Sequence, residues 1–221
     1  MAVLPAVAAS ATAQVPASPV LQNAFISPGL GLAANVAGGA SESFGGAAVG
    51  WGWGIGGVLP SGGLMISGAA GAQRINGSNR GGYGGRLAAS MSTDPSRPSA
   101  FGAGAFVGVG GAHRTRLDGF VNNPKMVTVP TGVTLGYRRM LGTSRAVSAY
   151  VSPMWRWTHW DEGAGFAFST GRFRVGLGLD FAFSPSFGLT FGGEMGQVLG
   201  PSTYAAPGVV GGAISFAPRR S

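Results

Sequence analysis

From residue 172 to residue 183, large apolar side chains alternate without interruption with small or charged ones. Successive side chains of a β-strand point to opposite faces, so this segment has one strongly apolar face and one polar face. A soluble domain must hide such a face in a core. A transmembrane barrel instead turns it toward lipid and keeps the polar face in its lumen. The apolar set is Phe173, Val175, Leu177, Leu179, Phe181 and Phe183.

The same alternation recurs along most of the chain and predicts ten strands separated by Gly, Pro, Asn, Asp and Ser clusters. The segments span about 11–18 residues, which matches or exceeds the roughly 9–11 residues that a tilted strand needs to cross a bilayer. Most of their connections alternate between short and long, as in outer-membrane barrels with both termini in the periplasm. The exceptions are the link at 93–98, which is long for a periplasmic turn, and the link at 76–79, which is short for an outer loop. The predicted strands are 24–36, 45–58, 63–74, 80–92, 99–113, 126–140, 145–158, 166–183, 187–198 and 208–217.

The composition fits a lipid-facing β-protein better than a soluble or disordered one. Only 10% of the residues are charged, against about 25% in ordinary soluble proteins. The mean hydropathy is +0.26, yet past the N-terminus no apolar run approaches the roughly 18 residues of a membrane helix. Glycine contributes 42 of 221 residues, but a hydrophobic fraction of 45% argues against Gly-rich disorder.

The formal charge of +8 comes almost entirely from arginine. A basic balance is often a sign of nucleic-acid binding. Here the arginines are scattered through alternating segments and loops, without a basic helix or arm, so we expect no nucleic-acid partner. Cysteine is absent, which removes disulfides and thiolate metal sites.

The N-terminus resembles the end of a secretory signal. A short apolar stretch is followed by small residues in an Ala-x-Ala pattern at 11–13. We expect residues 1–13 to be a signal peptide remnant and residues 14–221 to form a single barrel domain. An Ala-rich disordered tail is the alternative.

Aromatic residues concentrate near the ends of the predicted strands. In membrane barrels such residues form girdles at the two interfaces. In a soluble fold they would instead be core aromatics. The predicted membrane girdle consists of Trp155, Trp157, Trp160, Tyr137, Phe183 and Phe187.

In this architecture and periodicity, residues 22–217 resemble the small outer-membrane β-barrels of Gram-negative bacteria, the OmpA-like or opacity-type group. The resemblance implies an all-β, closed, antiparallel up-and-down transmembrane barrel in the outer membrane. Ten strands are expected, or eight if the first segment and one other lie outside the wall. Family barrels often end on an aromatic residue that the barrel assembly machinery recognises. Phe216 stands in that place here, although Ala217-Pro-Arg-Arg-Ser221 follows it.

Seven charged residues fall on the polar face and predict a charge network in the lumen. Charges inside a narrow barrel are expected to pair, because an isolated ion loses its hydration there. Glu194 is predicted within reach of Arg86 or Arg174. Two interpretations of this set are compatible with the sequence: a charge network that plugs the lumen, and an arginine-lined pore that prefers anions. The set is Arg86, Arg138, Arg156, Arg172, Arg174, Asp180 and Glu194.

The sequence offers little for catalysis. Its two histidines, His113 and His159, lie at separate strand ends, without metal-ligand spacing and outside any His-x-Ser motif. We therefore expect no enzyme activity, no metal and no cofactor. The expected role is structural or surface interaction, with outer-membrane lipid and lipopolysaccharide as partners and no surface ligand identified. A narrow, porin-like passive channel and a soluble, secreted, Gly-rich β-sandwich binding module are the alternatives.

Overall fold

The chain forms one closed sheet of ten antiparallel strands. The computed structural model describes residues 24–26, 28–39, 42–55, 62–75, 78–93, 98–114, 125–161, 167–197 and 206–217. No helix in this part of the chain is long and apolar enough to span a membrane. The strands are β1 (Gly29–Gly39), β2 (Glu42–Ile55), β3 (Gly62–Ile75), β4 (Ser78–Ser92), β5 (Ser99–Arg114), β6 (Lys125–Met140), β7 (Ala146–Asp161), β8 (Ala167–Ser184), β9 (Phe187–Gln197) and β10 (Ala206–Phe216).

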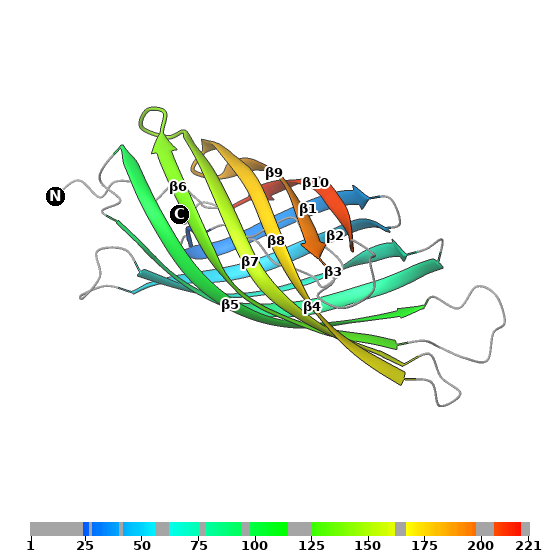
Figure 1. Cartoon of the computed structure of the whole chain (residues 1–221). Coiled ribbons are helices and arrows are strands. Elements are labelled where there is room, and N and C mark those ends of the chain that lie inside the picture. Colours follow the sequence, from blue (N-terminus) through cyan, green and yellow to red (C-terminus); the bar gives the residue numbers. More distant parts are fainter. Residues whose placement is uncertain are drawn as a thin grey trace.

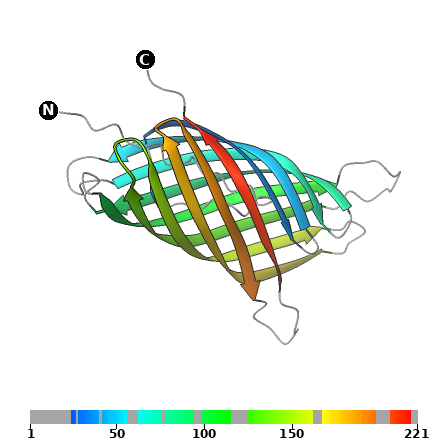
Figure 2. The same cartoon turned by 90° about the horizontal axis from the view of Figure 1, so that it is seen from above.

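Each strand pairs with the next along the chain, and β10 pairs with β1 to close the barrel (Figure 1). Seen from above, β10 lies beside β1 (Figure 2). The predicted fold class and the count of ten strands are confirmed. The β-sandwich alternative is wrong, because a single sheet closes on itself and no second sheet among the described residues covers its outer face.

The barrel has two distinct ends. We call the end where β1 begins and β10 ends the terminal end, and the opposite end the far end. Two connections at the terminal end are short. Leu141–Arg145 joins β6 to β7 with Gly142 at a φ of +121°, and Pro185-Ser186 joins β8 to β9. Such a positive φ favours glycine because it has no Cβ.

The alternation predicted from the sequence sorts the side chains onto the two sides of the wall. Large apolar residues on the outer face remain exposed, including Phe173 at 41% and Leu177 at 44%. Their neighbours Arg174 and Gly176 are buried inside. Because the side-chain period of a strand is two, one correct register fixes the facing of a whole strand.

Two predicted boundaries are wrong at the N-terminal side. The first strand starts at Gly29 rather than at residue 24, and the second starts at Glu42 rather than at residue 45, while residues 56–58 lie outside the described residues. Pro28 has no backbone N–H to donate to a ladder, and Gly29 has a φ of +112°. The chain therefore breaks before β1. The predicted signal remnant, residues 1–13, lies outside the described residues.

Residues 24–26 lie inside the lumen at the terminal end instead of in the wall. Phe25 is only 5% exposed and packs with Ala24 and Ala100. A Cβ on Gly102 would lie 2.8 Å from the Phe25 ring, so glycine makes room for it. This segment packs against the inner face of β5 and β6 near the terminal end.

The rest of the lumen is packed with side chains. One apolar cluster joins Met65, Ala88, Phe106 and Met154, with Ile26 packed against it. A second cluster joins β1, β2 and β10 around Phe44 and Val209. The interior therefore resembles a small protein core, in which side chains interlock at close range.

Close packing of the wall predicts that Gly71 does not tolerate a side chain. A Cβ there would lie 2.7 Å from Gly46 Cα and would contact the backbone oxygen of Gly45. We expect Gly71→Ala to lower the free energy of unfolding by about 1–3 kcal/mol, the usual cost of overpacking. Urea unfolding followed by tryptophan fluorescence measures this. Gly38→Ala is the matched control, since nothing lies within 4 Å of its Cβ. Equal stability of the two variants would contradict the prediction.

Candidate functional site

A buried ion cluster connects three strands in the lumen. Glu194 on β9 is 1% exposed. Arg156 Nη2 on β7 lies 2.8 Å from both of its carboxylate oxygens. Arg174 Nε on β8 contacts Glu194 Oε1. Arg174 is one of the two partners within the predicted reach of Glu194, and Arg156 is an additional one.

Strand register and a glycine bring these groups together. Gly176 lies opposite Glu194 in the β8–β9 ladder, and Arg174 lies opposite Gly196. A Cβ on Gly196 would come within 2.9 Å of the Arg174 Cγ, so the stem of the arginine passes over the glycine. The missing side chain lets the guanidinium group reach the carboxylate two residues away.

Three other predicted lumen charges lie elsewhere, each in its own surroundings. The guanidinium carbon of Arg86 lies 4.0 Å from the centroid of the Phe106 ring, a cation–π contact. That of Arg138 lies 4.9 Å from the Phe25 ring at the terminal end. Asp180 accepts a hydrogen bond from the Thr190 hydroxyl. The seven predicted residues therefore occupy several levels of the lumen.

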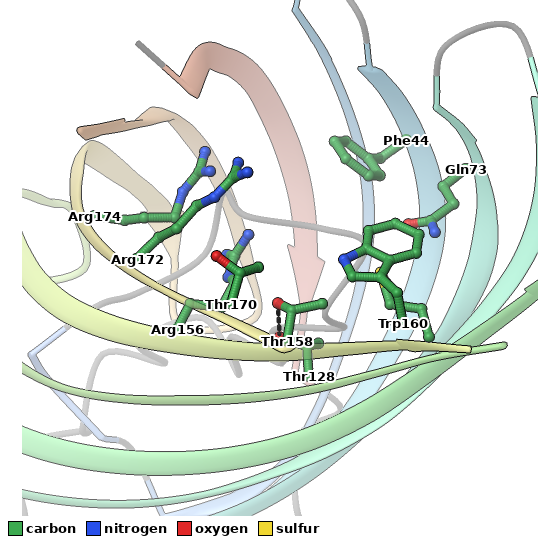
Figure 3. A pocket seen from close by; sticks show the side chains of 10 residues that line it. Phe44, Gln73, Thr128, Arg156, Thr158, Trp160, Thr170, Arg172 and Arg174 are labelled. Carbon is green, nitrogen blue, oxygen red and sulfur yellow. Dashed lines mark hydrogen bonds between the residues drawn. The ribbon is translucent and has the colours of Figure 1, made fainter. Parts of the chain in front are cut away.

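A cavity of about 90 Å³ lies toward the far end of the lumen (Figure 3). Arg172, the seventh predicted charge, lines it together with Arg156 and Arg174. Figure 3 shows the three guanidinium groups on one side of this cavity, with Trp160, Gln73 and Phe44 on the other. The lining is completed by Met126, Thr128, Thr158 and Thr170.

Polar residues that the sequence analysis did not select also belong to the cavity. The Thr158 hydroxyl donates to Thr128 Oγ1 at 3.2 Å, and the Thr128 hydroxyl donates to the Trp157 carbonyl oxygen at 3.0 Å. Gln73 is 3% exposed. All three are on inward positions of their strands. Strand parity alone identifies these positions as inward, although none of the three carries a charge.

The lumen closes on the terminal side of the ion cluster. Ser152 is 0% exposed and Thr134 is 1% exposed, and their hydroxyl oxygens lie 3.0 Å apart in a hydrogen bond. Met154, on the same inner face of β7, is 1% exposed. Solvent does not reach these inward side chains, so the cavity has a closed floor.

Five of the six residues predicted for a membrane girdle are exposed on the outer face. They are Trp155, Trp157, Tyr137, Phe183 and Phe187. The prediction is wrong for Trp160, because this residue lines the internal cavity. It occupies an even position of β7, whereas outward residues of that strand are odd-numbered. Its ring stacks on Phe168 at 6.3 Å between centroids, and the Arg80 guanidinium lies 4.9 Å from it.

One contact between a histidine and a serine forms across β7 and β8. His159 Nδ1 lies 2.9 Å from Ser169 Oγ, and the two residues are direct partners in the ladder. Their separation of ten residues hides this contact from a search for short motifs. Ser169 is exposed and His159 is half-buried, and the imidazole stacks on Trp157. Within the described residues, no three His, Asp or Glu side chains gather in a group suited to a metal.

No protein-family model matches the chain, and no curated protein matches its sequence. Among solved structures, the chain is similar to the translocator domain of autotransporter NalP from Neisseria meningitidis, with 14% identity and a TM-score of 0.49 over 88% of this chain and 89% of that one. It is also similar to KdgM porin, with 7% identity and a TM-score of 0.36 over 86% and 99%. These similarities concern the fold alone.

The buried ion cluster predicts a large effect of neutralising its one carboxylate. Glu194→Gln would leave Arg156 and Arg174 buried without their counter-charge, which typically costs about 3–5 kcal/mol of unfolding free energy. Urea titration against wild type measures it. Arg172→Gln is the control. That side chain is half-buried and has no ion pair with a described residue, so we expect a change within about 0.5 kcal/mol. Equal losses in the two variants would contradict the assignment.

Proposed function

We propose that the protein is a non-catalytic integral barrel of a bacterial outer membrane, with a structural or surface-interaction role. The outer face supports the membrane location. Large apolar residues are exposed on every strand, among them Leu32, Trp51, Ile66 and Phe191. Exposed apolar patches of this extent mark interaction or membrane surfaces. A closed sheet leaves no unpaired edge, as lipid requires.

The proposed orientation places the terminal end in the periplasm and the far end outside the cell. The start of β1 and the end of β10 then lie on the periplasmic side, as the first and last strand ends do in single-chain outer-membrane barrels. Exposed aromatic residues near the strand ends suit the two interfaces. Trp155 and Trp157 lie toward the far end, and Phe183 and Phe187 lie at the terminal end. Lipid and lipopolysaccharide are the proposed surroundings of this face.

The packed lumen supports a closed barrel over an open pore. A water-filled channel would leave inward side chains exposed. Here Met154, Ser152 and Glu194 are each at most 1% exposed. This burial is the single observation that favours a structural role over the anion-preferring pore. The three arginines at the cavity favour the pore instead. A conductance measurement distinguishes the closed barrel from the open pore.

The absence of catalysis is part of the proposal. A serine nucleophile needs a base, a group that orients the base and donors for the developing oxyanion. The contact between His159 and Ser169 supplies the first of these on an exposed outer surface, away from the cavity. The proposed surface contacts belong to residues 115–124, 162–166 and 198–205, which lie outside the described residues. The barrel assembly machinery is the proposed partner during biogenesis.

The membrane location predicts that a charge on the outer face blocks insertion. In Leu177→Arg a cation replaces an exposed apolar side chain in the middle of β8, which costs about 2–4 kcal/mol near the bilayer midplane. We expect wild type in the outer-membrane fraction with heat-modifiable migration in detergent, and the variant to lose both in part or completely. Leu177→Phe is the control and should behave as wild type. Wild type in the soluble fraction would contradict the proposal.

Because the lumen is closed, we expect the protein to conduct no ions in planar lipid bilayers. Wild type should show no steady conductance, because the cluster around Met65 fills the lumen. Phe106→Ala/Met154→Ala removes two of the three large side chains of that cluster and should give measurable openings. A porin in the same bilayer serves as the positive control. Steady wild-type conductance that Arg172→Gln reduces would establish the pore instead.

A further inference from the structure

We propose that the cavity at the far end binds a small soluble oxyanion, a phosphate or carboxylate group, in a dead-end site formed by Arg156, Arg172, Arg174 and Gln73. This site goes beyond the proposed structural role. It does not require transport, because the floor of the cavity is closed.

The first observation is an excess of positive charge around the cavity. Three guanidinium groups line it, and one carboxylate, Glu194, contacts two of them. Among the described inward-facing side chains, the other acid is Asp180. It lies six residues from Arg174 along β8, about 20 Å at the rise of a strand. Two positive charges therefore remain uncompensated by the described side chains at this level.

The second observation is the placement of the arginines. Arg156 and Arg172 are direct cross-strand partners, and Arg174 follows on the same face of β8. Like charges directly opposite each other in a sheet destabilise it. A bound anion between them would remove this repulsion. Such arginine pairs are suited to oxyanions, because each planar guanidinium presents two parallel N–H groups to two oxygens.

The third observation is Gln73, which faces the arginines across the cavity (Figure 3). Its side chain is 3% exposed, and neither its amide nitrogen nor its amide oxygen has a hydrogen-bond partner. Buried polar groups are nearly always paired, and an unpaired one costs about 1–3 kcal/mol. The amide nitrogen is placed to donate to a ligand in the cavity. The Nε of Arg172 is likewise buried and without a hydrogen-bond partner.

The size of the cavity is suited to a small ligand. Its 90 Å³ is well above the roughly 10–15 Å³ that one water needs, so several waters or one phosphate or carboxylate group fit. The hydroxyls of Thr158 and Thr170 line the same space. The aromatic side of the cavity, formed by Trp160 and Phe44, would by itself suit an apolar ligand. Three cations with hydroxyl and amide donors select an anion that accepts several hydrogen bonds.

Binding is tested on the folded barrel in zwitterionic detergent, purified without phosphate or anionic lipid. Inorganic phosphate and, separately, acetate are titrated at constant ionic strength, with heat and tryptophan fluorescence as readouts, since Trp160 lines the cavity. We expect saturable binding at one site per chain. Arg172→Gln should weaken it about tenfold or more through loss of a charge-assisted contact. Arg172→Lys should recover only part of the affinity. Lysine keeps the positive charge, but it lacks the two parallel N–H groups of the guanidinium.

The control is Arg139→Gln, which removes an exposed outward arginine at the opposite end and should leave binding unchanged. If Arg172→Gln does not fold, Gln73→Leu replaces it, since this variant keeps every charge and should also weaken binding. Absence of saturable binding of both anions would overturn the proposal. So would equal affinity of wild type and the cavity variant, or displacement by equimolar chloride. None of these results bears on the membrane location or the closed floor.

Discussion

Closure of the hydrogen-bonded ladder between β1 and β10 is the constraint on which the rest of the structure depends. Once Leu32 pairs with Phe216 and Val36 with Gly212, every strand has two neighbours and the sheet has no free edge. An inside and an outside then exist, and strand parity assigns each side chain to one of them. The apolar outer face, the packed lumen and the cavity all follow from this division.

Inside the barrel, several large side chains lie against glycines, which leave room for them. Tyr150 lies opposite Gly178, and the ring would collide with any Cβ there. Arg174 passes over Gly196 in the same way, and Phe25 lies against Gly102. Glycine on the inner face therefore does not produce an empty pore. It provides room for neighbouring side chains to cross the lumen, which is why many inner residues are almost fully buried.

Much of the fold was predictable from the sequence, because alternation is a local property. The fold class, the number of strands and the facing of Phe173, Leu177 and Arg174 required only a period of two. The start of β1 was missed, since residues 24–26 alternate like a strand but pack inside the barrel. Trp160 was assigned to the outer face from its position near a strand end, without its parity. The contacts of Glu194 with Arg156, and of His159 with Ser169, depend on the register between strands, which the alternation within one strand does not reveal.

The depth of each charged side chain in the lumen is related to the kind of group that stabilises its charge. Glu194 lies at the closed floor, where solvent does not reach, and it contacts two arginines. Arg86, also buried, lies against an aromatic face. Arg172 lies nearer the far end and is half-buried, where water or a dissolved ion can screen it. An uncompensated charge is costly in a dry interior and tolerable where solvent enters. The group of three arginines therefore lies next to the part of the lumen that a soluble anion can reach, and this position leaves the cavity able to bind one.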